Sequence, residues 1–417
     1  MTTKPNSTCN LSHQSLENEQ FFEEYIWWVE TIGNLSFGCI GVFLNFATII
    51  VLSSSTMLNN FFNRLLICLA VFDTLYLSCE ISEVFRHRHH TFIQQQIFVY
   101  FTYPMRNIFM FLSVYMTVVL AFERYQAITN PVKYRSKMVG TSMNSHLISN
   151  VVPGFSFAVI YYIPKFLDLY VGEEKDCLDN NEIQANNLNV SVINPSEPNL
   201  DRNCSTNHIL IPTSLRLHPQ YIFWYIIISN LTLTAFLPSV VLIYLNARIV
   251  TSLKKFKDRK KSFNTSNSLT TNVCETNKQA NSAKSTKTDL KKTFILFGIV
   301  ILFVLCHSLR VALNVNEFIE VAAQKVASNG EVCRTEGIWK QYAGPFNQLL
   351  VIVNSSLNFF IYVFFDNSFQ QVLRTHLQMK NRFHCTSMNG ENSADDMSRK
   401  CRGTTSIELN DINADEV

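Results

Sequence analysis

Seven long apolar stretches decide what this chain can fold into. Each has about 20 residues, the length that an α-helix needs to cross about 30 Å of hydrocarbon. They cover residues 31–52, 63–82, 97–122, 147–166, 221–245, 294–314 and 342–365. The composition, with 47% hydrophobic and only 16% charged residues, is also too apolar for an ordinary soluble enzyme. The sequence therefore predicts an all-α membrane protein with a seven-transmembrane helix bundle.

The charges between the stretches predict the orientation in the membrane. The link around residues 248–292 carries twelve basic and three acidic residues, and loops rich in Lys and Arg stay in the cytoplasm. Seven spans then place the amino terminus outside and the carboxyl terminus inside, as expected of a multi-pass plasma-membrane protein. The glycosylation sequons fall on predicted outer segments, at Asn6, Asn10, Asn189 and Asn203. Residues 1–24 lack the apolar core of a signal peptide, so the first span is expected to act as the targeting element.

The expected organisation follows from these spans. It comprises an outer tail at 1–30, the membrane domain at 31–366 with an outer link at 168–219 and a cytoplasmic link at 249–292, an amphipathic eighth helix at 367–380 and a tail at 381–417. The eighth helix suits the inner leaflet because its apolar residues follow a helical period. Cys385 follows as a palmitoylation candidate or an unmodified thiol. The cytoplasmic link and the tail are rich in polar residues, so we expect both to be disordered.

The outer link combines an acidic charge with two cysteines. Between residues 168 and 219 there are eight acidic and three basic residues, which either attract cationic ligands or serve solubility alone. Outside the membrane, thiols oxidise to disulfides. The outer cysteines are Cys9, Cys177, Cys204 and Cys333, which allow three pairings. Cys177 with Cys204 would close a loop within the link, and Cys9 with Cys333 would join the tail to the last outer loop.

A carboxylate lies midway along the second span, where an isolated charge is costly. Asp73 therefore needs polar partners, and the candidates are Ser113 in the third span and Asn354 and Asn358 in the seventh. The two asparagines are four residues apart and so share a helix face. The group is either a cage for a sodium ion or an interhelical hydrogen-bond knot without an ion.

The inner end of the third span carries the charged pair Glu123-Arg124, followed by Tyr125. Arg124 and Asp289 both fall at the inner surface, so an ion pair between them would join helices three and six. Glu123 offers the arginine a competing partner. The alternative is that Arg124 simply extends to the membrane interface.

Polar residues in the outer halves of the spans suggest a ligand cavity. The candidates are Glu80, Glu83, Tyr103, Arg106, His307, Arg310, Asn314, Tyr342 and Gln348. Such residues mark a polar cavity open to solvent, although the arginines and glutamates could also neutralise one another. As a set they predict a ligand that is charged and aromatic rather than small and apolar.

The pattern of residues across the seven spans resembles that of the rhodopsin-like (class A) G-protein-coupled receptors. The matching positions are Asn45, Leu69, Asp73, Ser113, Glu123-Arg124-Tyr125, Pro238, Phe303, Cys306, Asn358 and Tyr362. His307 and Leu309 replace the family's usual Trp and Pro, and Phe359 replaces a Pro in the seventh helix. No cysteine begins the third span.

Within the family, the run Cys306-His307-Ser308-Leu309-Arg310 resembles invertebrate receptors for FMRFamide-like neuropeptides, as does Tyr103-Pro104. The resemblance implies an extracellular peptide ligand. A peptide ending in Arg-Phe-amide would place its guanidinium against Glu80 or Glu83 and its amide against Gln348 or Asn314. Arg106 stands where amine receptors carry an aspartate, and it would repel an ammonium group.

The resemblance also implies a mechanism and partners. Ligand binding would move helix six outward and free Arg124 from Asp289 to contact a heterotrimeric G protein, with Asn358 and Tyr362 part of the switch. Arrestin is a further implied partner, whereas nucleic acid is not, and no cofactor is expected apart from an allosteric sodium ion. No nucleophile–base set or phosphate loop indicates an enzyme. The alternatives are a chemosensory receptor of the same fold and an ion-coupled transporter, for which the internal repeats are lacking.

Overall fold

The computed structural model describes residues 15–89, 91–140, 142–177, 204–266, 276–326 and 338–387. For residues 15–19, 87–89, 174–177, 204–207, 256–266, 276–292, 320–326, 338 and 379–387 only the backbone is described. The chain divides into two units, Met1–Asn367 and Ser368–Val417, and each is treated by itself.

Seven helices in the described part are long and apolar enough to span a membrane. They run over Gln20–Leu52, Phe61–Arg86, Phe92–Thr129, Met143–Leu167, Pro219–Lys255, Thr293–Ile319 and Trp339–Phe365. The predicted seven-helix bundle is therefore confirmed. Most helices exceed their apolar stretches, because hydropathy marks only the part that suits hydrocarbon and the backbone stays helical until a cap or break.

The spans are assembled from shorter elements. The first comprises α1 (Ser15–Ile26), the π-helical η1 (Trp27–Gly33) and α2 (Asn34–Leu52). The short α3 (Ser55–Leu58) precedes α4 (Phe61–His89), which is the second. The third comprises α5 (Phe92–Ile97), η2 (Phe98–Thr102) and α6 (Tyr103–Thr129), and the loop helix α7 (Pro131–Gly140) follows it. The fourth is α8 (Met143–Tyr162) with the 3-10 turn η3 (Ile163–Leu167).

The second half of the bundle begins after a hairpin. Strands β1 (Leu169–Cys177) and β2 (Cys204–Pro212) are followed by α9 (Ser214–Leu217). The fifth span comprises α10 (Pro219–Tyr221), η4 (Ile222–Ser229), η5 (Leu231–Phe236) and α11 (Leu237–Ser266). The sixth is α12 (Thr276–Val326), and the seventh is α13 (Ile338–Ser356) with α14 (Asn358–Phe365).

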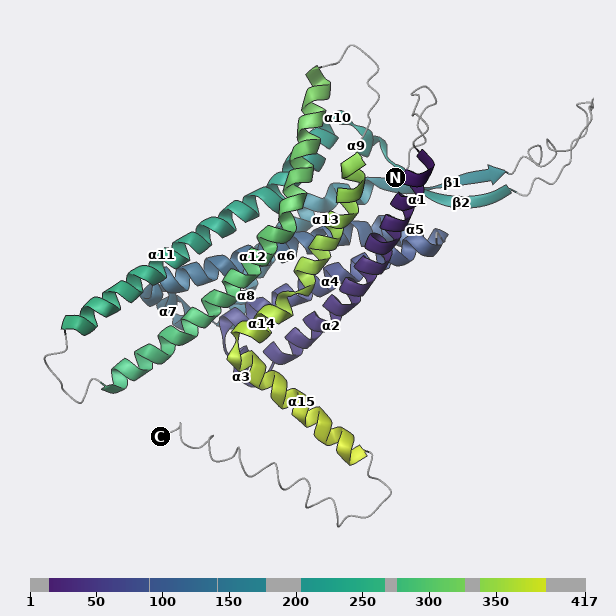
Figure 1. The fold of residues 1–417 in the computed structure, drawn as a ribbon. Coiled ribbons are helices and arrows are strands. Elements are labelled where there is room, and N and C mark those ends of the chain that lie inside the picture. Colours follow the sequence, from purple (N-terminus) through teal and green to yellow (C-terminus); the bar gives the residue numbers. More distant parts are fainter. Residues whose placement is uncertain are drawn as a thin grey trace, which may run out of the picture. The chain divides into compact units, whose positions relative to one another are not determined.

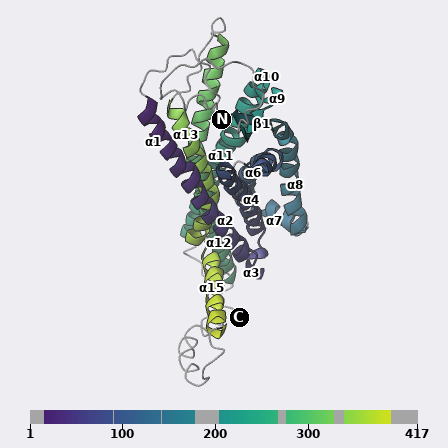
Figure 2. The same cartoon turned by 90° about the vertical axis from the view of Figure 1, so that its right-hand side faces the viewer.

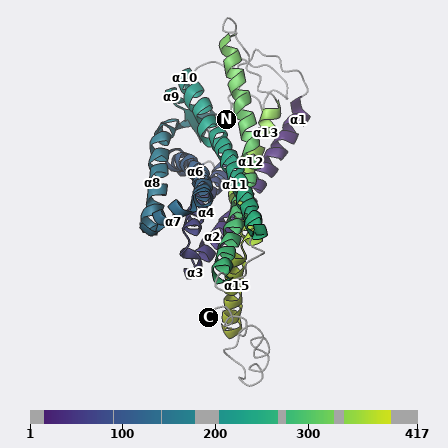
Figure 3. The ribbon, with the colours of Figure 1, turned by 90° about the vertical axis from the view of Figure 1, so that its left-hand side faces the viewer.

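The helices form a ring around α6. Helix α6 packs against α4, α8, α11 and α12, and the ring closes through contacts of α12 with α13, α13 with α2, and α2 with α4 (Figure 1). Seen from the two sides, α8 lies at one edge of the bundle and α1 at the other (Figures 2 and 3). The core between them is apolar, with Phe62, Leu69, Leu112 and Phe303 almost fully buried.

Two helices show how the missing prolines are accommodated. Helix α12 is continuous through Leu309, in agreement with the absence of a kinking proline. The seventh helix nevertheless breaks between α13 and α14 at Leu357, although no proline follows Asn358. The Ser356 hydroxyl donates to the carbonyls of Ile352, at 2.7 Å, and of Phe37, at 3.1 Å. A serine that bonds the preceding turn bends a helix, and this provides a cause for the break.

The outer link folds into an antiparallel hairpin. The β1–β2 ladder runs from Leu169 opposite Pro212 to Cys177 opposite Cys204. The hairpin packs against α5, η2, η3 and α9, so it covers one end of the bundle. We call this end the hairpin end, and the opposite end, which carries α3 and α7, the α7 end.

The structure corrects three expected boundaries. The first helix begins at Ser15, inside the segment 1–30 expected to be a tail. Residues 251–266 and 276–292 continue α11 and α12, so most of the link expected to be disordered is helical. Helix α15 (Asn367–Ser387), which lies in the second unit from Ser368 onward, continues seven residues past position 380, where the expected amphipathic segment ends. In each case the helix extends beyond its apolar or amphipathic segment into polar sequence that contains no Pro or Gly to end it.

Candidate functional site

The centre of the bundle holds a network of three buried polar residues. The Ser113 hydroxyl donates to Asp73 Oδ1 at 2.5 Å, and the Asn358 amide donates to Asp73 Oδ2 at 2.9 Å. Asp73 is completely buried. The predicted meeting of helices two, three and seven is thus present, and we call these three residues the Asp73 network. Asn354 is also buried, but it makes no hydrogen bond to Asp73 among the described contacts.

Two further predicted residues lie beside the Asp73 network. The Asn45 amide donates to the Ser355 carbonyl at 2.8 Å, which joins the first helix to the seventh. Tyr362 is 1% exposed and lies close enough to Asp73 to interact with it electrostatically. The network has a carboxylate and a hydroxyl, oxygen ligands of the kind that a sodium ion accepts.

Near the α7 end, Arg124 is 3% exposed and its guanidinium lies 4.0 Å above the centre of the Phe62 ring. A desolvated cation over an aromatic face is attracted by the ring quadrupole, so Phe62 holds Arg124 inside the bundle. Glu123 accepts a hydrogen bond from the Tyr134 hydroxyl of α7. Tyr125 is partly buried one residue further on. Asp289 belongs to α12, but its side chain lies outside the described residues, so its pairing with Arg124 stays a prediction.

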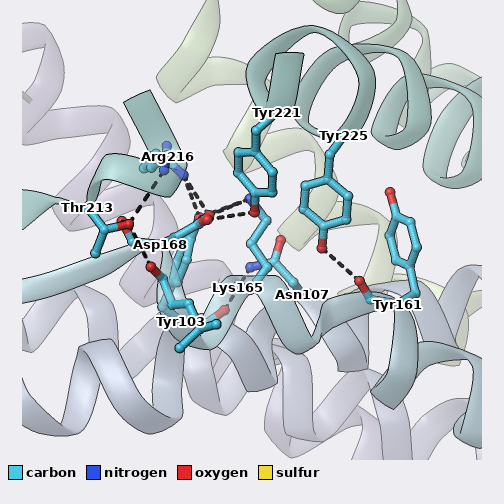
Figure 4. Close-up of polar contacts among 10 residues, drawn as sticks. Tyr103, Asn107, Tyr161, Lys165, Asp168, Thr213, Arg216, Tyr221 and Tyr225 are labelled. Carbon is cyan, nitrogen blue, oxygen red and sulfur yellow. Dashed lines mark hydrogen bonds and ion pairs between the residues drawn. The ribbon is translucent and has the colours of Figure 1, made fainter. Parts of the chain in front are cut away.

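At the hairpin end, one buried aspartate joins four parts of the chain (Figure 4). Asp168 Oδ2 accepts from Lys165 Nζ and Arg216 Nη1, both at 2.9 Å, and Oδ1 accepts from the Tyr221 hydroxyl at 2.6 Å. The Tyr103 hydroxyl donates to the same carboxylate at 3.2 Å. We call these five residues the Asp168 cluster. It connects the start of α6, the end of the fourth span, the α9 turn and the start of the fifth span.

The charge of Asp168 is stabilised by its neighbours. Burial by itself would raise the pKa of its carboxyl, but Lys165, Tyr221 and Arg216 outweigh burial and hold the pKa below its usual value. The pKa of Arg216 is correspondingly raised by Tyr103 and Asp168, against the opposing effect of burial. Asp168 therefore stays ionised. Sequence analysis counted it among solvated acidic residues of the outer link, and the structure shows it to be 0% exposed.

Glu80 gathers two of the predicted ligand residues. Gln348 Nε2 donates to Glu80 Oε2 at 2.6 Å, and Arg106 Nη1 lies 3.7 Å from the same oxygen. Glu80 is 3% exposed. Glu80 and Arg106 therefore neutralise each other in this structure, which is the alternative that the sequence left open.

Glu83 has a different partner. Arg86 binds it through two hydrogen bonds, of 3.1 Å and 2.7 Å, and donates a third to Gln95 at 3.0 Å. All three residues are buried. A bidentate pair of this kind is a strong and directional interaction. The pair holds Arg86 in place within α4, and its third bond, to Gln95, joins the end of α4 to α5.

Four polar residues in the same half of the bundle have unused hydrogen-bonding groups. His307 is 1% exposed, and neither ring nitrogen has a partner among the described residues. The same holds for the Tyr162 hydroxyl and the Asn314 amide nitrogen. Arg310 is close enough to Tyr162 and His307 for its charge to act on both. We call these four residues the Arg310 cluster.

Arg310 itself is held by a weak partner. Its Nη1 lies 2.8 Å from Met110 Sδ of α6, and no described carboxylate lies within 4.0 Å of it. A thioether is a poor acceptor, so most of the hydrogen-bonding capacity of this guanidinium is unused. Buried polar groups in native proteins are normally paired, and those that are not need an explanation such as a ligand.

Two predicted ligand residues serve the framework instead. Tyr103 belongs to the Asp168 cluster, where Lys165 and Arg216 also donate to its hydroxyl. Tyr342 packs edge-on against Phe22 and Tyr25 of α1, and its carbonyl accepts from the Tyr25 hydroxyl at 2.7 Å. Tyr342 thus anchors the amino-terminal helix to the seventh helix.

Sequence reasoning did not assign a role to Asp168, Lys165, Arg216 or Tyr162. One signal was present, since Lys165 and Asp168 have the spacing of an i,i+3 ion pair at a helix end. Arg216 and Tyr221 are about fifty residues further along, and nothing local predicts that they return to the same carboxylate. The sequons at Asn6, Asn10, Asn189 and Asn203 and the cysteines Cys9 and Cys333 lie outside the described residues.

Seven membrane-spanning helices joined by a central Asp73 network, with a buried arginine at the α7 end, are the arrangement expected of a membrane receptor. Residues 44–362 match the family model described as 7 transmembrane receptor (rhodopsin family), and the chain belongs to that family. It is thus a G-protein-coupled receptor of the plasma membrane, and members of the family are signalling receptors rather than enzymes. The resemblance inferred from sequence is confirmed.

One named relative is similar to this chain along most of its length. The FMRFamide receptor of Drosophila melanogaster is 23% identical over 345 residues, which cover 80% of this chain. The match covers 51% of that protein, so this chain spans about half the length of its relative.

Proposed function

We propose that this chain is the receptor for an extracellular neuropeptide of the FMRFamide type and that it activates a heterotrimeric G protein. The observation that carries the proposal is the Arg310 cluster, in which His307, Tyr162 and Asn314 have buried polar atoms with no hydrogen-bond partner among the described residues. Support also comes from the similarity to a protein that is itself named an FMRFamide receptor. The hairpin end is then extracellular, and the basic link between α11 and α12 is cytoplasmic.

The contacts at Glu80 and Arg310 refine the proposed pose of the peptide. Gln348 already donates to Glu80, so it is less suited to bind the peptide's terminal amide. Asn314, one helical turn after Arg310, has an unused amide. We therefore place the carbonyl oxygen of the terminal amide against Arg310 and the Asn314 amide nitrogen, both of which are donors, with the phenylalanine ring among aromatic residues such as Tyr162.

Two conclusions about covalent and ionic features extend the proposal. The ladder places the backbone of Cys177 directly opposite that of Cys204, which favours a disulfide between them over the pairing with Cys9 or Cys333. The oxygen ligands of the Asp73 network would hold a sodium ion, with Asp73 supplying the balancing charge and Ser113 a hydroxyl ligand. Such an ion would stabilise the inactive arrangement by joining helices two, three and seven.

The proposed coupling depends on Arg124. In the inactive state its guanidinium lies over Phe62, and we propose that Asp289 of α12 is its ionic partner. When α12 moves outward, Arg124 becomes available to the G protein. Arg124→Ala should therefore abolish signalling while peptide binding remains, and Asp289→Asn should raise signalling without ligand. Unchanged basal activity in Asp289→Asn would contradict the ionic lock.

A ligand panel tests the proposal as a whole. Cells that express the full chain are treated with amidated peptides, including several ending in Arg-Phe-amide, with amines, lipids and volatiles as controls, while second messengers are recorded. The Arg124→Ala variant serves as the uncoupled control. A response to Arg-Phe-amide peptides is expected. A response only to volatiles or lipids would favour a chemosensory receptor and contradict the peptide proposal.

A further inference from the structure

Two arginines, Arg106 and Arg310, extend from the third and sixth helices toward the same region of the bundle. Arg106 and Met110 are four residues apart in α6, so they share one face of that helix and lie about 6 Å apart along its axis. Arg310 of α12 contacts the same face, because its Nη1 lies 2.8 Å from Met110 Sδ. The charges of Arg106 and Arg310 are also close enough to act on each other. Two guanidinium groups from different helices therefore converge.

Most donors of these two guanidinium groups are unused, and they can be reached by solvent. Arg106 makes no hydrogen bond to a described residue, and its side chain is 24% exposed. Its guanidinium lies 5.9 Å from the centre of the Tyr103 ring, a contact that leaves the N–H groups free. Arg310 is partly buried, with Met110 as its one hydrogen-bonding partner in the described part. None of the unused nitrogens is among the fully buried unpaired atoms of the described residues, so they face space that a ligand can enter.

The balance of charge around the two arginines is positive. Among the described carboxylates, only Glu80 lies within 4.0 Å of either guanidinium, at 3.7 Å from Arg106, and it also accepts from Gln348. Glu83, one helical turn along α4, is paired with Arg86. Two guanidinium groups thus share one carboxylate, which leaves one positive charge without a counter-charge. A charge that is partly removed from water without a partner is destabilising, so this region favours an anionic group from a ligand.

We propose that Arg106 and Arg310 together bind a carboxylate of the peptide ligand. A guanidinium presents its N–H donors in a planar fork that matches the two oxygens of a carboxylate. This inference rests on the proposed function and names the ligand class more closely. The carboxyl end of an Arg-Phe-amide peptide is neutral, so the carboxylate belongs to an aspartate or glutamate side chain before that end. Arg310 has enough donors to contact the terminal amide as well.

The proposal adds a contact of opposite sign to the one expected from sequence. The sequence predicted that Glu80 or Glu83 would accept the guanidinium of the ligand, but Glu80 already accepts from Gln348 and Glu83 from Arg86. The charge that this part of the bundle lacks is therefore negative. A carboxylate held by both arginines joins α6 to α12, so its binding acts directly on the helix that is expected to move.

The first test compares peptides that differ by one charge. Each ends in Arg-Phe-amide and carries aspartate at one of the three positions before the arginine, and its partner carries asparagine there. On the unmodified receptor, the best aspartate peptide should be at least about tenfold more potent than its partner, which is the effect of one charged hydrogen bond. Arg106→Gln and Arg310→Gln should each reduce this preference to less than about threefold. Arg106→Lys, which keeps the charge, should retain more of it.

A charge change outside the site is the matched control. Glu173→Gln alters one charge at an exposed position of β1 and should leave the preference for aspartate unchanged. Equal potency of the two peptides on the unmodified receptor would overturn the carboxylate site, and so would a full preference in Arg106→Gln. In both cases a response to Arg-Phe-amide peptides would leave the proposed function standing.

A second measurement does not depend on the identity of the peptide. The purified full-length receptor is heated in detergent with N-acetyl-aspartate-amide, with N-acetyl-asparagine-amide and with added sodium chloride as controls. The aspartate compound should raise the unfolding temperature of the unmodified receptor and of Glu173→Gln, but not that of Arg106→Gln. An equal shift in all three proteins, or no shift in any, would refute the site even if a peptide activates the receptor. A shift of the same size with chloride would show a site for any small anion and would also contradict the proposal.

Discussion

The Asp168 cluster and the Arg310 cluster each combine a guanidinium with aromatic side chains, and both lie in the half of the bundle next to the hairpin. In the Asp168 cluster, four side chains donate to one carboxylate. In the Arg310 cluster, a guanidinium has only a thioether as its described partner, and three neighbours have unused polar atoms. The Asp168 cluster, in which every charge is paired, stabilises the framework. The Arg310 cluster keeps donors and acceptors that a ligand can bind.

Removing the charge of Arg310 should have the largest effect and tests most directly whether the two clusters differ in function. Arg310→Gln should reduce peptide potency by roughly 10- to 100-fold, because a hydrogen bond to a charged group contributes about 1.5–3 kcal/mol. Its unfolding temperature should stay the same or rise, since a partly buried cation with only a thioether partner is costly. Ser308→Ala, an exposed neighbour on the same helix, is the matched control. Lower thermal stability with unchanged potency would show that Arg310 belongs to the framework.

Asp168→Asn should show the opposite pattern. The variant leaves Lys165 and Arg216 without a carboxylate, and we expect a loss of about 2 kcal/mol in stability. Unfolding temperature and surface expression should fall, while the potency of the receptors that fold changes less than threefold. Glu173→Gln, an exposed position on β1, is the control. A large loss of potency without a loss of stability would place Asp168 in the ligand site.

Acid should weaken the Asp168 cluster selectively. The folded pKa of Asp168 lies below the ordinary value of 3.8, so its contribution to stability is complete above that value. It is lost as the pH falls through the lower, folded pKa. Thermal unfolding measured from pH 6 downward should therefore show an extra decline below about pH 4. Asp168→Asn should lack this component, and an identical decline in both proteins would assign it to other carboxylates.

The smallest expected effect concerns the Asp73 network, which is intermediate between the two clusters in how completely its polar groups are paired. If sodium completes it, replacing choline chloride by sodium chloride at constant ionic strength should lower agonist affinity a few-fold, because the ion stabilises the inactive state. Asp73→Asn should remove the dependence. The same affinity in both salts would mean that Ser113 and Asn358 complete the network without an ion.

The sequence predicted the parts of the molecule that depend on local pattern. Seven apolar stretches predicted seven helices, and the meeting of Asp73 with Ser113 and Asn358 followed from their depth in the membrane. The Asp168 cluster was beyond such reasoning, because Arg216 reaches Asp168 only through the register of the hairpin, which hydropathy does not encode. The start of the first helix at Ser15 was missed for a similar reason. Its aromatic residues are held by Tyr342, more than three hundred positions away.

The Asp168 cluster also has a consequence for how the receptor is made. Val99 and Tyr100 of the third span are not cysteines, and among the described residues the hairpin meets this span through the Asp168 cluster and through the packing of Leu169 with Phe98 and Val99. Assembly of this junction needs no thiol oxidation and no disulfide isomerase. The junction should therefore form in reducing cell-free synthesis, and dithiothreitol should leave it intact.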